Sequence, residues 1–161
     1  IMYNMFMIKN KILSLVLFTL TTFFASFIGG IATISSKEPW YSTLNKSTLT
    51  PPDWIFAPVW TTLYFFMSVA IWLAWHSSSE NRKLIYIYFS HVIFNTTWSI
   101  VFFVFHNILL ALINLNIILI FIVVLMIQYR KINIVSFYLM IPYLLWSIYA
   151  LFLNVNLLIL N

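Results

Sequence analysis

The residues of this chain that could do chemistry are polar and aromatic side chains set at helical spacing inside apolar stretches. His91, Asn95 and Ser99 follow one another at intervals of four residues, so they share one face of a helix, with Trp98 at its edge. Because a polar group in an apolar helix must find a partner away from lipid, we expect Asn95 and Trp98 near a ligand. Hydrogen bonding between helices, which would lock a bundle, is the alternative.

Two aromatic stripes accompany this polar face. Trp60 and Tyr64 share one helix face, and Tyr143, Trp146 and Ala150 share another further along the chain. The small Ala150 leaves space beside the rings for a flat molecule. Either stripe alone is typical of packing, but the two stripes together with the polar face predict a pocket for a planar apolar ligand.

The chain lacks the residues that conventional catalytic and metal-binding sites usually contain. The chain has no cysteine, which excludes disulfides and thiolate chemistry. His76, His91 and His106 lie fifteen residues apart, so local spacing does not bring them together and we expect no metal site. The sequence has no Gly-rich phosphate loop and no serine nucleophile motif. Its acidic residues all fall in connections: Glu38, Asp53 and Glu80.

The composition indicates which elements position these residues. Of 161 residues, 63% are hydrophobic and 7% are charged, and the mean hydropathy is +1.01, which is typical of a chain that folds in lipid. A helix of about 20 apolar residues crosses the hydrocarbon core of a bilayer. The sequence therefore predicts an all-α membrane protein, a five-transmembrane-helix bundle forming a single domain over residues 1–161. The stretches of sufficient length, all without Lys, Arg, Asp or Glu, are 12–34, 55–76, 84–105, 108–128 and 134–153.

The one long connection, residues 35–54, is expected to cap one end of the bundle. Its prolines, among them Pro51, forbid a continuous helix and stiffen the backbone. Long constrained loops often carry binding residues, so we place Trp40 and Pro51 among the ligand-binding residues. A plain solvated connector is the alternative.

The basic residues predict an orientation. Six of them lie at the N-terminus and in the second and fourth connections, whereas the opposite side has only Lys37 and Lys46. This bias predicts the N-terminus inside and the C-terminus outside, in a bacterial cell membrane or, in a eukaryote, the mitochondrial outer membrane. The net charge of +5 then reflects topology and affinity for lipid headgroups, with no reason to invoke nucleic acid. We interpret the first apolar stretch as a retained helix and not a cleaved signal.

Small residues mark a contact face on the first apolar stretch. Ala25, Gly29 and Thr33 follow at four-residue spacing, with Ser26 and Gly30 one step round. Small residues let helix backbones approach closely in lipid. This face should contact another helix, either within the bundle or in a second chain.

Two ordered blocks of residues resemble a known family over nearly the full length of the chain. The residues that carry the resemblance are Trp40-Tyr41, Leu44, Lys46, Pro51-Pro52, Trp54, Phe56, Pro58-Val59-Trp60, Leu63-Tyr64, Met67, Ala70, Trp75, Asn95, Trp98-Ser99, Phe102-Phe103, Ala111, Pro142-Tyr143-Leu144, Trp146, Ala150 and Leu153-Asn154. In these positions the chain is similar to the translocator protein family, also called the tryptophan-rich sensory protein or peripheral benzodiazepine receptor family.

The resemblance implies a five-helix bundle, commonly a homodimer, with a ligand cavity under the first loop. Family members bind tetrapyrroles such as protoporphyrin IX, so a porphyrin or haem-type tetrapyrrole is the implied ligand, and no cofactor is required. By matching position, Trp60, Asn95, Trp146 and Ala150 would be pocket residues. The implied function is a sensor or receptor acting in tetrapyrrole-linked or stress responses. Light- and oxygen-dependent porphyrin degradation, with Trp60 and Trp146 as the catalytic residues, and a small oligomeric transporter are the alternatives.

The chain departs from the family pattern at a few positions. Ser47 stands where the family usually has Pro, Ser68 where it has Gly, and Ile100 where it has Pro. We expect these changes to make the backbone of the loop less rigid and to alter the packing of the helices. The sterol-recognition segment of animal members needs a basic residue near the end of the last helix, and nothing beyond Lys131 is basic, so sterol binding is not supported.

Overall fold

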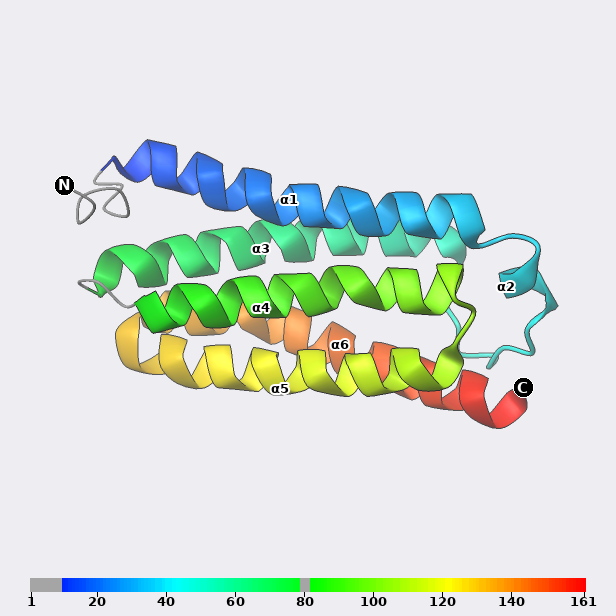
Figure 1. Ribbon diagram of the computed structural model, residues 1–161. Helices are drawn as coiled ribbons and strands as arrows, with labels where there is room; N and C mark the ends of the chain where they lie inside the picture. Colours follow the sequence, from blue (N-terminus) through cyan, green and yellow to red (C-terminus); the bar gives the residue numbers. More distant parts are fainter. Residues whose placement is uncertain (1–9, 79–81) are drawn as a thin grey trace.

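The computed structural model describes residues 10–78 and 82–161, and this part of the chain consists of helices joined by one long connection and several short ones (Figure 1). Lys9, one of the basic residues at the N-terminus, and the acidic Glu80 lie outside the described residues. Five of the helices are long and apolar enough to cross a bilayer. The all-α, five-span prediction is therefore confirmed. The helices are α1 Lys11–Ser36, α2 Trp40–Thr43, α3 Phe56–Ser77, α4 Arg82–Ser99, α5 Ile108–Ile132 and α6 Ile134–Leu160, with a 3-10 turn at Asp53–Ile55 and a π-helical turn at Ile100–Val104.

Asparagine side chains begin three of the long helices. Oδ1 of Asn10 accepts hydrogen bonds from the backbone N–H groups of Ile12 and Leu13 at 3.0 and 3.1 Å. Asn107 does the same at the start of α5 and Asn133 at the start of α6. The first N–H groups of a helix have no partner within the helix, so these caps satisfy them at the starts of α1, α5 and α6.

The last helix is longer than its hydropathy suggests. α6 ends at Leu160, whereas the apolar stretch was predicted to end at residue 153. Asn154 and Asn156 interrupt the apolar run, but neither breaks a helix, and Asn156 Nδ2 donates to the carbonyl of Phe152 at 2.8 Å within α6. The extra turns bring the end of α6 to the long connection.

The long helices form a closed ring around the core. α1 packs on α3 and α4, α3 packs on α6, α6 on α5, and α5 on α4. Figure 1 shows them side by side along their length, with α2 and the long connection at the end where the C-terminus lies. The core consists of residues such as Met67, Ile71 and Ile122, which are fully buried. Large apolar side chains also cover the outside, for example Phe24 and Ile120, as expected for a surface that contacts lipid.

The small-residue face of α1 packs within the bundle. A Cβ atom on Gly29 would lie 3.3 Å from Oγ of Ser99 on α4, so this glycine allows a close approach. One turn earlier, Thr96 Oγ1 donates to the carbonyl of Ala25 at 3.4 Å. Gly30, one step round, has nothing within 4 Å of an added Cβ. The structure thus assigns the face of Ala25 and Gly29 to the contact between α1 and α4.

Candidate functional site

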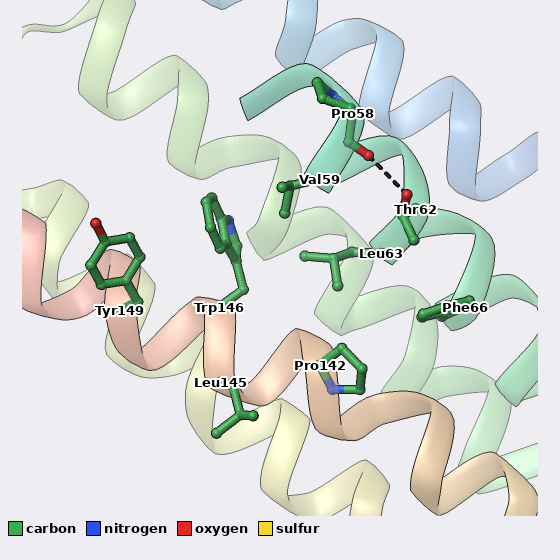
Figure 2. Close-up of a pocket in the computed structure, with 9 residues that line it drawn as sticks. All are labelled: Pro58, Val59, Thr62, Leu63, Phe66, Pro142, Leu145, Trp146 and Tyr149. Carbon is green, nitrogen blue, oxygen red and sulfur yellow. Dashed lines mark hydrogen bonds between the residues drawn. The ribbon is translucent and has the colours of Figure 1, made fainter. Parts of the chain in front are cut away.

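A groove runs between α3 and α6 on the outer side of the bundle (Figure 2). Its volume is about 580 Å³, within the range usual for small-molecule pockets. Residues spaced by one helical turn line each wall, because those positions share a helix face. The lining residues are Pro58, Val59, Thr62, Leu63 and Phe66 from α3 and Pro142, Leu145, Trp146 and Tyr149 from α6.

The walls of this groove are almost wholly apolar. The hydroxyl of Thr62 donates to the carbonyl of Pro58 at 2.9 Å, so its proton is already used within α3. The indole of Trp146 stands against Tyr149, with ring centroids 5.6 Å apart, and projects toward α3 in Figure 2. Pro142 and Leu145 are exposed on the outer side. The groove therefore opens toward the lipid and offers a flat aromatic wall.

Proline leaves one polar group near this apolar surface. Pro142 lies inside α6 and has no N–H, so the carbonyl of Tyr138, four residues earlier, lacks its usual helical donor. Positions 138 and 142 share a helix face. This carbonyl is a hydrogen-bond acceptor close to the groove wall.

The long connection is tied to α6 at the end of the groove. The hydroxyl of Tyr149, a lining residue, donates to the carbonyl of Leu49 at 2.5 Å. The backbone N–H of Asn45 donates to Oδ1 of Asn161 at 2.9 Å, and Nδ2 of Asn161 donates back to the carbonyl of Asn45 at 3.0 Å. The connection therefore rests on the C-terminal end of α6, at the end of the bundle where we expected a cap.

Aromatic and basic side chains pack together within this connection. Trp40 stacks on His106, with ring centroids 4.4 Å apart. Lys37 and Lys46 lie over the ring of Tyr41, at 5.0 and 4.5 Å from its centroid. Burial raises the pKa of the Tyr41 phenol, and nearby acidic side chains raise it further. These contacts give the connection a defined shape at the end of the bundle.

Four side chains joined by hydrogen bonds fill the interior between α3, α4 and α6. Tyr64 donates its hydroxyl proton to Oδ1 of Asn95 at 2.5 Å. Asn95 Nδ2 donates to the hydroxyl oxygen of Tyr143 at 2.6 Å, and that hydroxyl lies 2.8 Å from Nε2 of His91. All four side chains are buried. The polar face of α4 thus forms the interhelical hydrogen bonds that were the alternative to a ligand site.

Trp60 lies beside this chain of hydrogen bonds. Its indole is half-buried, with its ring centroid 5.5 Å from that of Tyr64 and 6.1 Å from that of Tyr143. It is not among the residues that line the groove. Trp60 and Trp146 therefore lie on the same pair of helices, but Trp60 contacts the buried tyrosines whereas Trp146 lines the groove.

The remaining site predictions fall in three places. Ala150 is half-buried and packs against the core. Trp98 stacks on Phe102 with ring centroids 5.0 Å apart, and Trp40 meets the edge of the same ring. Pro51 lies half-buried in the long connection. None of these residues lines the groove.

Of the residues predicted to bind the ligand, the groove is lined by Trp146 alone, and the roles of the others stay predictions. We expected walls from the second, third and fifth spans, but the groove residues come from the second and fifth spans alone. The reason is that the phenols of Tyr64 and Tyr143 fill the space toward α4, where Asn95 bonds to both. Sequence reasoning missed the residues around Trp146, because apolar side chains on a lipid-facing surface look alike whether or not they border a groove. Those residues are Val59, Thr62, Leu63, Phe66 and Leu145.

Fold and site together define a multi-pass helical membrane protein with an aromatic-walled groove between its second and fifth spans. The TspO/MBR family model matches residues 17–160, so the chain belongs to the TspO/MBR family. It is 34% identical to the tryptophan-rich protein TspO of Archaeoglobus fulgidus, over 94% of this chain and 99% of that protein. It is 32% identical to the tryptophan-rich sensory protein of Cereibacter sphaeroides, over 77% and 78% of the two chains. The human translocator protein is 26% identical, over 85% of this chain and 83% of that protein.

Proposed function

We propose that this protein is a membrane receptor or sensor that binds a tetrapyrrole such as protoporphyrin IX, with the macrocycle in the groove between α3 and α6. The observation that carries the proposal is the groove itself, which is about 580 Å³ in volume and has the Trp146 indole on one wall. A flat apolar ring system gains stabilisation from stacking on an aromatic side chain and from leaving water. The name of the Cereibacter sphaeroides relative, a sensory protein, fits a receptor role.

The long connection suits the polar edge of such a ligand. Porphyrin carboxylates favour the end of the groove nearest water and cationic groups. Tyr149 holds Leu49 at that end, and Lys46 lies in the same connection. We therefore infer that the carboxylates face this connection while the macrocycle lies against α6.

Filling the groove tests this proposal. Leu145→Trp adds a large ring to a lining residue that is 62% exposed, so the change occupies the groove with little effect on the core. We expect the affinity for protoporphyrin IX, measured from the change in its absorption on titration, to fall about tenfold, which corresponds to about 1.4 kcal/mol.

Ile148→Trp is the matched control, because Ile148 lies on α6, is 50% exposed and is not a lining residue. It should bind protoporphyrin IX like the unaltered protein. Equal affinity for the Leu145→Trp variant and the unaltered protein would place the ligand elsewhere.

We also propose that the protein is a homodimer with its N-terminus inside a bacterial cell membrane. The ends of the bundle carry unequal charge: α1, α4 and α5 begin or end with basic residues on one side, whereas Lys37 pairs with Asp53 on the other. The absence of native cysteine allows single-cysteine labelling. A membrane-impermeant maleimide added to intact cells should label Ser42→Cys and spare Ser77→Cys, both at exposed positions, and the reverse pattern would contradict the orientation.

A further inference from the structure

Two buried tyrosines flank the indole of Trp60. The Tyr64 ring centroid lies 5.5 Å from that of Trp60, and the Tyr143 ring centroid lies 6.1 Å from it. Tyr143 is completely buried and Tyr64 is 9% exposed. At these separations an electron passes readily between rings, so distance alone allows either tyrosine to reduce an oxidised Trp60.

The two phenols differ in what can accept their protons. A phenol gives up an electron easily only if its proton leaves as well, because the phenol radical cation is a very strong acid. The hydroxyl of Tyr64 donates to the amide oxygen of Asn95, which is a very weak base. The hydroxyl of Tyr143 lies 2.8 Å from Nε2 of His91, and an imidazole nitrogen, even where burial disfavours its charged form, is a far stronger base than an amide oxygen. The chemistry therefore favours Tyr143, although Tyr64 is the nearer ring.

Asn95 fixes the direction of the Tyr143 proton. Its Nδ2 donates to the Tyr143 oxygen at 2.6 Å, so the single proton of that hydroxyl is left to donate to His91 Nε2. His91 is then neutral, with its own proton on Nδ1, which has no hydrogen-bond partner among the described residues. His91 is completely buried, so water does not compete for the transferred proton, and the strong acidity of the oxidised phenol has to offset the cost of a buried imidazolium.

We propose that Trp60, Tyr143 and His91 form a relay that moves an electron and a proton together to repair an oxidised Trp60. One electron passes from the Tyr143 phenol to the Trp60 indole radical cation, and the hydroxyl proton of Tyr143 passes to His91 Nε2. The products are neutral Trp60, a neutral Tyr143 phenoxyl radical and a His91 imidazolium. One positive charge is present before and after the step. The oxidant that forms the indole radical is a one-electron acceptor, and a photo-excited aromatic molecule is of this class.

The relay goes beyond ligand binding and can be tested without any tetrapyrrole. The purified full chain is illuminated with ultraviolet light, which excites its indoles, in the presence of hexaamminecobalt(III), an irreversible one-electron acceptor. Samples are frozen and their radicals measured by electron paramagnetic resonance. We expect a tyrosyl radical that is lost, down to the level of the Trp60→Phe variant, in Tyr143→Phe. Tyr64→Phe should retain it.

Two further variants separate proton transfer from packing. His91→Gln keeps a hydrogen-bond acceptor near Tyr143 but removes the base, so the indole radical should persist and the tyrosyl radical should be lost while the thermal midpoint changes little. Tyr129→Phe is the control for a buried tyrosine, because the Tyr129 hydroxyl has no partner in the described part of the chain. It should give the full tyrosyl signal.

Heavy water gives an independent readout. Conversion of the indole radical to the tyrosyl radical should slow about twofold or more in deuterated buffer in the unaltered protein. Unchanged tyrosyl yield in either Tyr143→Phe or His91→Gln would overturn the relay. Because no ligand is present, this result is independent of whether protoporphyrin IX binds the groove.

Discussion

The helices α3 and α6 meet along two faces with opposite chemistry. On the inner face Tyr64 and Tyr143 are buried and joined through Asn95 of α4. On the outer face Thr62 and Leu145 are exposed beside an open apolar groove. Polar side chains thus join the helices on the inner face, whereas apolar side chains on the outer face leave an open groove.

The membrane environment explains this division. Lipid tails are as apolar as leucine, so burying apolar surface between helices gains little, and hydrogen bonds and close packing determine which helices associate. A buried polar group without a partner costs free energy in lipid, so Tyr64, Asn95 and Tyr143 are satisfied first by one another. An apolar groove has no such requirement and is left open to the bilayer.

Breaking the inner face should have the largest effect. Asn95→Leu leaves the hydroxyl of Tyr64 without its acceptor and that of Tyr143 without a donor. Each buried group left unsatisfied costs about 1–3 kcal/mol, so we expect the free energy of unfolding to fall by about 2–4 kcal/mol. Thermal unfolding in detergent, followed by circular dichroism, measures this change.

Asn116→Leu is the matched control for that variant. Asn116 is exposed on α5, and its amide donates only to the carbonyl of Leu112 in the same helix. Its replacement should leave the thermal midpoint nearly unchanged. If the two variants unfold alike, the hydrogen bonds of Asn95 do not hold the bundle together.

The close contact of α1 with α4 should be the next most sensitive place in the interior. Gly29→Leu forces a side chain against Ser99, whose Oγ lies 3.3 Å from the position of a Cβ atom. Overpacking of this kind costs about 1–3 kcal/mol. Gly30→Leu faces open space and should cost almost nothing, so similar thermal midpoints for the two variants would argue against this contact.

The outer face should affect binding and not stability. Trp146→Phe shrinks the aromatic wall of the groove but keeps a ring against Phe56 and Tyr149, and we expect the affinity for protoporphyrin IX to fall up to about tenfold, or about 1.4 kcal/mol, with little change in thermal midpoint. Trp146→Ala should lower the affinity as well, with a loss of stability smaller than that of Asn95→Leu. Trp54→Ala, at a tryptophan that is 74% exposed in the connection, is the control for loss of an indole. A large drop in stability for Trp146→Ala would remove the distinction between the two faces.

The tether between the connection and α6 should have the smallest effect. Tyr149→Phe removes the hydroxyl that donates to Leu49 and keeps the ring in the groove. The expected loss is about 1 kcal/mol, which is usual for one hydrogen bond. Hydrogen exchange of the backbone around Leu49 should speed up, while exchange in α3 and α6 stays the same. Faster exchange throughout the bundle would mean that the tether supports the fold as a whole.

Much of the fold could be predicted because its signals are local. Apolar length placed the spans, and α1, α3, α4 and α5 begin within two residues of the predicted limits. The end of α6 was missed because hydropathy falls at Asn154, although the backbone continues as a helix to Leu160. Hydropathy reports lipid contact and not helix length, and these differ where a helix extends to the membrane surface.

The site was predictable only in part. Helical spacing placed Tyr64, Asn95 and Tyr143 on faces that meet in the structure, where they bond to one another, whereas the sequence analysis expected them around a ligand. Helical spacing did not predict that Trp98 stacks on Phe102, because this contact depends on the π-helical turn Ile100–Val104. It also did not predict that Trp40 stacks on His106, because this contact depends on the path of the long connection. Their role in ligand binding stays a prediction.

The sequence by itself determined the class of protein, the number of spans and the polar and aromatic faces, because hydropathy and helical periodicity act over a few turns of one segment. Only the tertiary structure decided which partner each face takes. In the structure Gly29 packs against α4, Asn95 bonds to two tyrosines and Trp146 lines an open groove. The physical reason is that a hydrogen-bonding side chain or a small residue accepts many neighbours, and the choice among them depends on how all five helices pack together.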